Sequence, residues 1–313
     1  MKRLQNRIAE SRFALPVTAV YATAAWLAGG LISSDSYIEF AVFAVSAYLM
    51  AELNNRHALI RMYSRMVSCS FLVLATLAAS AAGGTSWAAG TADVWIVQLC
   101  FIVAYLFLFS SYQDKRAQGK MFYAFMAIGV ASTLFVQALF FVPLLWVLTA
   151  TNLMAFSSRN LWASIIGLTV PYWFYGGYCA LTGNIGYLTA HFAPDAWLKP
   201  LFITDGADAA TIATTAFIAT VTVIGAVHFI RNSYKDKIRT RMLYEMPITV
   251  TAFCLAFMLL QPGHLPMLMG ILIIHSSILA GHFFALTSTR LTNITFCVLT
   301  TAAVALTVVN FIL

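Results

Sequence analysis

Long apolar runs separated by short polar segments make up almost the whole chain. Eleven such runs occupy residues 14–32, 37–53, 67–84, 93–111, 121–138, 141–156, 162–182, 209–230, 247–261, 265–287 and 293–312. An α-helix needs roughly 20 apolar residues to cross the hydrocarbon core of a bilayer. The runs lack the strict apolar–polar alternation of barrel strands, and a spanning segment must satisfy its own backbone hydrogen bonds. The pattern predicts an all-α, polytopic transmembrane helical bundle of about eleven spans.

The stretch 121–156 leaves the number of spans open between ten and eleven. It is apolar throughout and contains Pro143, and proline disfavours a continuous helix. We expect two short helices with a tight turn near residues 141–143, and one long tilted helix is the alternative. The run Gln261-Pro262-Gly263 predicts a second very short turn between two helices.

Composition excludes a soluble globule. Hydrophobic residues make up 61% of the chain and charged residues only 9%, whereas a soluble domain carries about 25% charged residues. The five cysteines show no metal-ligand spacing and fall in or at the edge of apolar runs, where cysteine behaves as a small hydrophobe. No motif for nucleotide binding, hydrolysis or metal binding is present.

The basic residues indicate an orientation. With the N-terminus in the cytoplasm, 17 of the 18 Lys and Arg residues lie on the cytoplasmic side, and only Lys199 lies outside. The net charge of +7 is therefore a topology signal, and we expect no nucleic-acid partner. Residues 1–13, with Leu4 and Ile8 on one helical face, predict a cytoplasmic interfacial amphipathic helix. Residues 14–313 form a single transmembrane helical domain whose C-terminus lies outside.

Two acidic residues, Asp35 and Glu39, are the first candidates for catalysis. They lie between the first two predicted spans on the outer side, and their spacing of four places them on one helical face. Paired carboxylates can act as a general base or hold a divalent cation. The alternative is a helix-capping aspartate and an interfacial glutamate. No cofactor is expected otherwise, and no metal site beyond this alternative.

Arginines of two cytoplasmic segments are candidates for binding a lipid phosphate. They are Arg56, Arg61, Arg65, Arg239 and Arg241. The planar guanidinium fork suits phosphate oxygens. The alternative is that they only set the topology and contact ordinary headgroups.

Three histidines lie within predicted spans: His228, His275 and His282. Ionisable residues inside a membrane are candidates for function. His228 and His282 are both near cytoplasmic helix ends, where they could together hold haem or a metal. The alternative is that neutral histidines form hydrogen bonds between helices.

Four stretches resemble an uncharacterised, domain-of-unknown-function family of bacterial polytopic inner-membrane proteins, some of which are mislabelled as β-carotene monooxygenases. The stretches are 51–55, 122–132 with 143–146, 158–173 and 238–245. The resemblance implies the bacterial inner membrane and no established activity. The position of Asp35 and Glu39 is weakly similar to the first outer loop of multi-pass polyprenyl-phosphate-dependent glycosyltransferases, in which an acidic residue is catalytic.

These features lead to three hypotheses. The first is a role in envelope glycan or lipid-linked saccharide handling, as a small glycosyltransferase, a flippase or an accessory subunit. The second is a transporter for a small solute, and the third is a structural membrane subunit of an envelope complex. The expected partners are membrane lipids, among them a polyprenyl phosphate, and proteins of such a complex.

Overall fold

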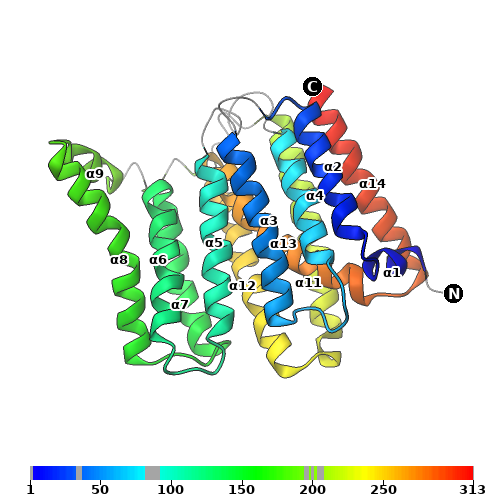
Figure 1. The fold of residues 1–313 in the computed structure, drawn as a ribbon, viewed down its shortest axis with the longest axis horizontal. Helices are drawn as coiled ribbons and strands as arrows, with labels where there is room; N and C mark the ends of the chain where they lie inside the picture. The colour runs from blue at the N-terminus through cyan, green and yellow to red at the C-terminus, as the bar shows by residue number, and fades with distance from the viewer. Residues whose placement is uncertain are drawn as a thin grey trace.

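The computed structural model describes residues 3–32, 37–81, 92–193, 197–198, 201–202 and 208–312. Within these ranges the chain forms helices and no strand, which confirms the all-α prediction (Figure 1). The helices are α1 (Leu4–Ala9), α2 (Ala14–Ala28), α3 (Tyr37–His57), α4 (Met66–Ala81), α5 (Asp93–Ser110), α6 (Gln118–Leu134), η1 (Val136–Phe140), α7 (Phe141–Thr151), α8 (Ser158–Leu181), α9 (Ile185–His191), α11 (Ala209–Asn232), η2 (Ser233–Lys235), α12 (Ile238–Leu260), η3 (Pro262–His264), α13 (Leu265–Leu286) and α14 (Arg290–Ile312).

Several helices have the length and composition needed to cross a membrane. In the described part of the chain these are five segments: Asp93–Ser110, Ala209–Lys235, Ile238–Leu260, Pro262–Leu286 and Arg290–Ile312. Shorter apolar helices lie at Ala14–Ala28, Met66–Ala81 and Val136–Thr151. Each of the eleven apolar runs of the sequence coincides with a helix. These are the features of a multi-pass membrane protein.

The long apolar stretch 121–156 forms two helices, but the break is not where the proline suggested. Phe135 adopts an extended conformation (φ −135°, ψ 92°) and ends α6. Pro143 lies in the first turn of α7, where a missing backbone N–H breaks no helical hydrogen bond. The turn predicted at Gln261-Pro262-Gly263 is present as η3, between α12 and α13.

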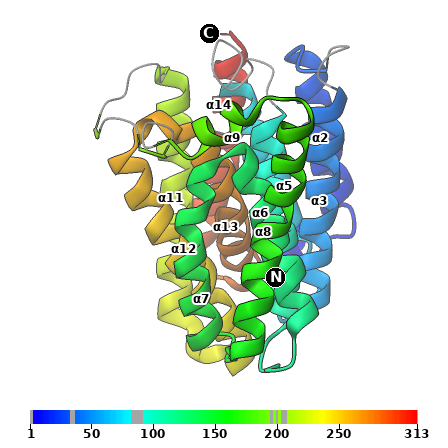
Figure 2. The same cartoon turned by 90° about the vertical axis from the view of Figure 1, so that its left-hand side faces the viewer.

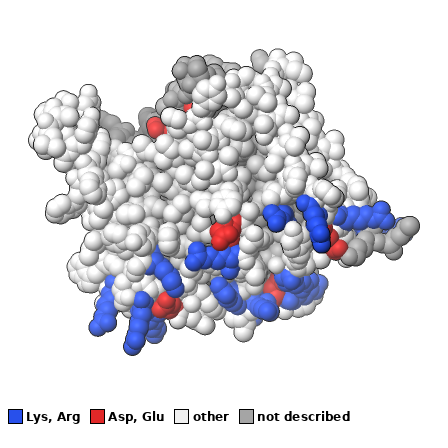
Figure 3. Space-filling model, in the orientation of Figure 1, with Lys and Arg blue, Asp and Glu red and all other residues white. Residues whose placement is uncertain are grey.

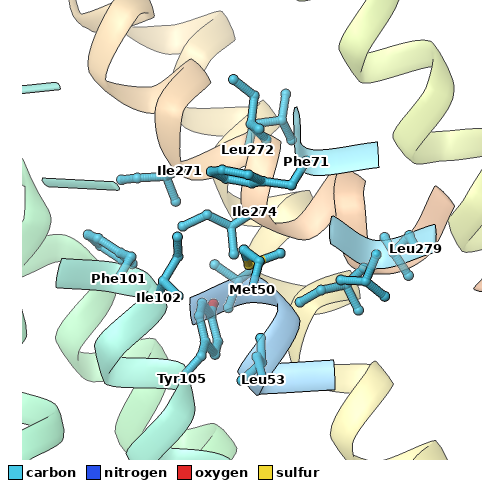
Figure 4. Close-up of a cluster of buried hydrophobic side chains, with 14 of the residues drawn as sticks. Met50, Leu53, Phe71, Phe101, Ile102, Tyr105, Ile271, Leu272, Ile274 and Leu279 are labelled. Atoms are coloured by element: carbon cyan, nitrogen blue, oxygen red, sulfur yellow. The ribbon is translucent and has the colours of Figure 1, made fainter. Parts of the chain in front are cut away.

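Helix α13 forms the core of the bundle. It packs against α4, α5, α11 and α12, and almost all its side chains are buried. Figure 4 shows Ile271, Leu272, Ile274 and Leu279 of α13 among side chains from α3, α4 and α5. A helix with apolar residues on all its faces is expected at such a buried position.

Glycines allow two pairs of helices to approach closely. A Cβ on Gly225 of α11 would lie 2.8 Å from the backbone of Leu279 in α13. A Cβ on Gly167 of α8 would clash with the carbonyl oxygen of Phe122 in α6. Helices α6 and α8 accordingly lie side by side in both ribbon views (Figures 1 and 2). Small residues at helix crossings are typical of membrane bundles.

The described Lys and Arg side chains gather along one end of the molecule, at the bottom and lower right of Figure 3. We call this the basic end; it holds the connections 58–65, 111–117, 152–157, 233–237 and 287–289. Hydrogen bonds join these connections. The amide of Gln113 donates to the carbonyl of Leu153 (2.7 Å), and Arg61 donates to the carbonyl of Lys235 (3.2 Å).

Candidate functional site at the basic end

Two arginine-containing segments that are far apart in the sequence meet at the basic end. The connection after α3 carries Arg61, and the turn before α12 carries Lys235 and Asp236. Besides its bond to the carbonyl of Lys235, the Arg61 guanidinium lies 3.8 Å from Oδ1 of Asp236. The two segments that carry the cations predicted to bind phosphate are therefore in contact with each other.

Asp236 joins this surface to the interior of the bundle. Its Oδ2 lies 3.1 Å from Nε2 of His282, and the two side chains are only 4% and 1% exposed. Burial by itself raises the pKa of Asp236, but the hydrogen bond from His282 and the charges of His282 and Arg61 outweigh it and lower the pKa below its ordinary value. Asp236 is therefore ionised at neutral pH.

Aromatic and polar side chains surround the His282 ring. Its centroid lies 5.9 Å from that of His228, 4.9 Å from Tyr244 and 5.0 Å from Phe229. The Nδ1 atoms of both histidines and the Tyr244 hydroxyl are buried without a hydrogen-bond partner among the described residues. We call Asp236, His282, His228 and Tyr244 the buried polar cluster. One carboxylate, two imidazoles and a phenol can hold a proton and exchange it.

The remaining predicted phosphate ligands also lie at the basic end. Arg65 donates from Nε to the Tyr63 hydroxyl (3.0 Å), and the guanidinium of Arg239 lies 5.9 Å from the centre of the Tyr112 ring. Arg56 is exposed in the last turn of α3, and Arg241 is partly buried in the first turn of α12. Arginines held against aromatic rings keep their N–H donors available for a ligand.

The acidic pair predicted near the outer surface is separated from these arginines. Asp35 lies outside the described residues, and Glu39 is in the first turn of α3. Arg56 is in the last turn of the same helix, so the two residues are about 25 Å apart along its axis. A single headgroup cannot contact both Glu39 and the arginines.

Two other buried histidines, His275 and His264, form hydrogen bonds between elements. The Tyr105 hydroxyl and His275 Nε2 are 2.7 Å apart, which joins α5 to α13. His264 and Gln137 are bonded at 3.0 Å near the opposite end. Within the described ranges, no group of three or more His, Cys, Asp or Glu residues is placed to hold a metal ion.

Sequence reasoning missed Asp236. In the sequence it stands between Lys235 and Lys237 and reads as part of a basic, solvated run. The signal that could have found it is its place between two predicted spans, close along the chain to His228. A carboxylate between membrane helices needs a cationic or hydrogen-bonding partner.

Comparison with known proteins gives no relative for this arrangement. No family model, curated protein or solved structure matches the chain. The function must therefore be inferred from the residues themselves.

Proposed function

We propose that this chain is a protein of the bacterial inner membrane with eleven spans, whose N-terminus and basic end face the cytoplasm. The proposal is supported by the 17 of 18 Lys and Arg residues that an eleven-span arrangement assigns to one side. It is further supported by the hydrogen bonds that join the connections at the basic end.

Reporter fusions test this orientation. Alkaline phosphatase is active only outside the cytoplasm, whereas green fluorescent protein fluoresces only when it stays in the cytoplasm. A phosphatase fused after Ile312 should be active, and one fused after Ser157 should be inactive, with the fluorescent reporter giving the reverse. A fluorescent fusion after Ile312 would contradict the odd number of spans.

We further propose that the basic end binds the phosphate of a polyprenyl-phosphate lipid in envelope glycan or lipid-linked saccharide handling. The contact between Arg61 and the Lys235 carbonyl carries this proposal, because it brings the two arginine segments to one place. Charge-assisted, bidentate bonds from arginine are the strong way to hold a phosphate. The family resemblance supports the inner-membrane setting of this role.

The geometry favours a flippase or accessory subunit over a glycosyltransferase. A transferase of the kind outlined above would need an acidic residue beside the phosphate-bearing headgroup. Glu39 lies at the end of α3 opposite Arg56. The arginines would then bind the phosphate of one lipid, while Glu39 could act only on the headgroup of another lipid at the opposite end.

Lipid binding by the purified protein in nanodiscs tests the proposal. We expect Arg239→Ala with Arg241→Ala to weaken binding of a polyprenyl phosphate about tenfold or more, since a hydrogen bond to a charged group contributes about 1.5–3 kcal/mol. Arg159→Ala is the matched control, because Arg159 is a basic-end arginine in the first turn of α8, outside both segments. Equal losses of affinity in the Arg239→Ala, Arg241→Ala double variant and in Arg159→Ala would show only general electrostatic attraction and would overturn the proposal.

The buried polar cluster favours a second candidate, a proton-coupled transporter of a small solute. Buried Asp and His residues between membrane helices are the usual material of proton relays. Proteoliposomes that contain a pH-sensitive dye test this candidate. Proton uptake driven by an added solute, lost in Asp236→Asn, would support it; no uptake with a broad panel of solutes would count against it.

A further inference from the structure

A cavity of about 290 Å³ opens between helices at the edge of the bundle. Residues of α2, α4, α11, α13 and α14 line it, together with Ile8 of α1; Figure 1 shows these helices at the right of the molecule. Apolar side chains form most of its wall, among them Val17, Val73, Phe217, Val221 and Leu299. Its volume is at the lower end of the roughly 300–1,000 Å³ typical of ligand pockets. A cavity of this size and lining suits one hydrocarbon chain.

Four hydroxyl-bearing residues interrupt the apolar wall: Ser11, Thr18, Ser70 and Thr300; of these, Ser70 is the buried one. Ser70 of α4 is 6% exposed and lines the cavity. Its hydroxyl oxygen is buried without a hydrogen-bond partner among the described residues. A buried hydroxyl without a partner costs free energy, so an acceptor on a ligand in the cavity would be stabilised here.

Two arginines adjoin lining residues of the cavity along the chain. Arg65 directly precedes Met66, the first residue of α4, which lines the cavity. Arg12 is exposed between Ser11 and Phe13, which both line the cavity. Arg65 precedes Ser70 by five residues, or about 7.5 Å along a helix. Along α4, the cation of Arg65 is thus followed by the Ser70 hydroxyl and then by the apolar lining residues Val73 and Leu74.

We propose that this cavity is a binding site for an anionic glycerophospholipid. One acyl chain occupies the apolar cavity, an ester carbonyl accepts a hydrogen bond from the Ser70 hydroxyl, and Arg12 and Arg65 hold the phosphate. The ester distinguishes this ligand from a polyprenyl phosphate, which has no carbonyl to offer Ser70. The site shares Arg65 with the first of the two arginine segments, but it excludes Arg239 and Arg241 and does not depend on the proposed function.

Native mass spectrometry with added phosphatidylglycerol tests the site. Val73→Trp and Thr300→Trp each fill the cavity from a partly exposed lining position. We expect each to lower the affinity for phosphatidylglycerol at least tenfold, and Ser70→Ala to lower it severalfold. Val298→Trp is the matched control, because Val298 is 59% exposed on α14 and does not line the cavity. Equal binding by Val73→Trp and Val298→Trp would overturn the proposal.

Thermal unfolding with added lipid is a second measurement. It does not depend on the tryptophan variants, which can fold poorly, and it distinguishes phosphatidylglycerol from a polyprenyl phosphate. Phosphatidylglycerol should raise the midpoint of thermal unfolding of the unaltered protein and of Val298→Trp, but not of Arg12→Gln with Arg65→Gln. Arg239→Ala with Arg241→Ala should leave this shift unchanged even if it abolishes binding of a polyprenyl phosphate. If a polyprenyl phosphate gave the same shift through Ser70, the assignment to a glycerophospholipid would be wrong.

Discussion

His282 of α13 donates a hydrogen bond to Asp236, which precedes α12, across 3.1 Å in a place where both side chains are almost completely buried. This bond links the helix at the centre of the bundle to the connection that carries Arg61's partners. Removing a buried, charged acceptor leaves its buried donor unsatisfied. The pair should therefore matter for stability as well as for the chemistry of the site.

Removing the carboxylate should destabilise the protein. We expect Asp236→Ala to lower the free energy of unfolding by about 1–3 kcal/mol, because the His282 donor loses its acceptor. Thermal unfolding in detergent, followed with a thiol-reactive dye, is a suitable measurement because four of the cysteines are buried.

Asp114→Ala is the control for that experiment. Asp114 pairs with Lys120 at 2.9 Å, but the two side chains are 38% and 40% exposed. An exposed ion pair contributes about 0–1 kcal/mol. Equal effects of Asp236→Ala and Asp114→Ala would show that burial of the first pair has no energetic consequence.

The lowered pKa of Asp236 predicts a pH dependence. A carboxyl group whose pKa is lower in the folded state stabilises the fold above its unfolded-state pKa of about 3.9 and loses that effect as the pH falls through the folded-state value. The difference in unfolding midpoint between the unaltered protein and Asp236→Asn should be constant from pH 7 to pH 5 and shrink below about pH 4. A difference that already shrinks between pH 7 and pH 5 would contradict the lowered pKa of Asp236.

The close approach of α11 to α13 predicts that Gly225→Ala is destabilising. The added Cβ would meet the Leu279 backbone at 2.8 Å, so the two helices must separate. Overpacking of this kind costs about 1–3 kcal/mol. Gly177→Ala in α8 is the control, since a Cβ there has no neighbour within 4 Å among the described residues. The control should be neutral or slightly stabilising, because alanine favours a helix.

Gln5 should hold α1 against the bundle. Its side-chain nitrogen donates to the carbonyl of Phe284 (2.8 Å) and to the Thr287 hydroxyl (2.5 Å), and the residue is fully buried. We expect Gln5→Ala to release α1 and to accelerate trypsin cleavage after Arg7 and Arg12 severalfold. Leu4→Ala should leave the rate unchanged, because Leu4 is 54% exposed. Unchanged cleavage of Gln5→Ala would show that the remaining contacts of α1, among them the bond from the Asn6 side chain to the Thr287 carbonyl, hold the helix without the Gln5 side chain.

The sequence predicted the helices well because each apolar run is a local property of the chain. It misplaced the break near Phe135, since no glycine or proline marks that residue and the extended backbone there reflects packing. It found the arginines but missed Asp236, whose role depends on His282, 46 residues away. The sequence also did not predict the cavity beside α1, because a gap between six helices leaves no periodic pattern in the sequence of any one of them.

The bond between Gln5 and Phe284 has a consequence for how the protein is made. The two residues are 279 positions apart, so the acceptor emerges from the ribosome long after the donor has reached the membrane. Until α13 is inserted, Gln5 has no acceptor from that helix, and α4 and α5 lack the helix around which they pack. The bundle can therefore close only after α13 has been synthesised and inserted, and until then the earlier helices remain in the lipid without their partner.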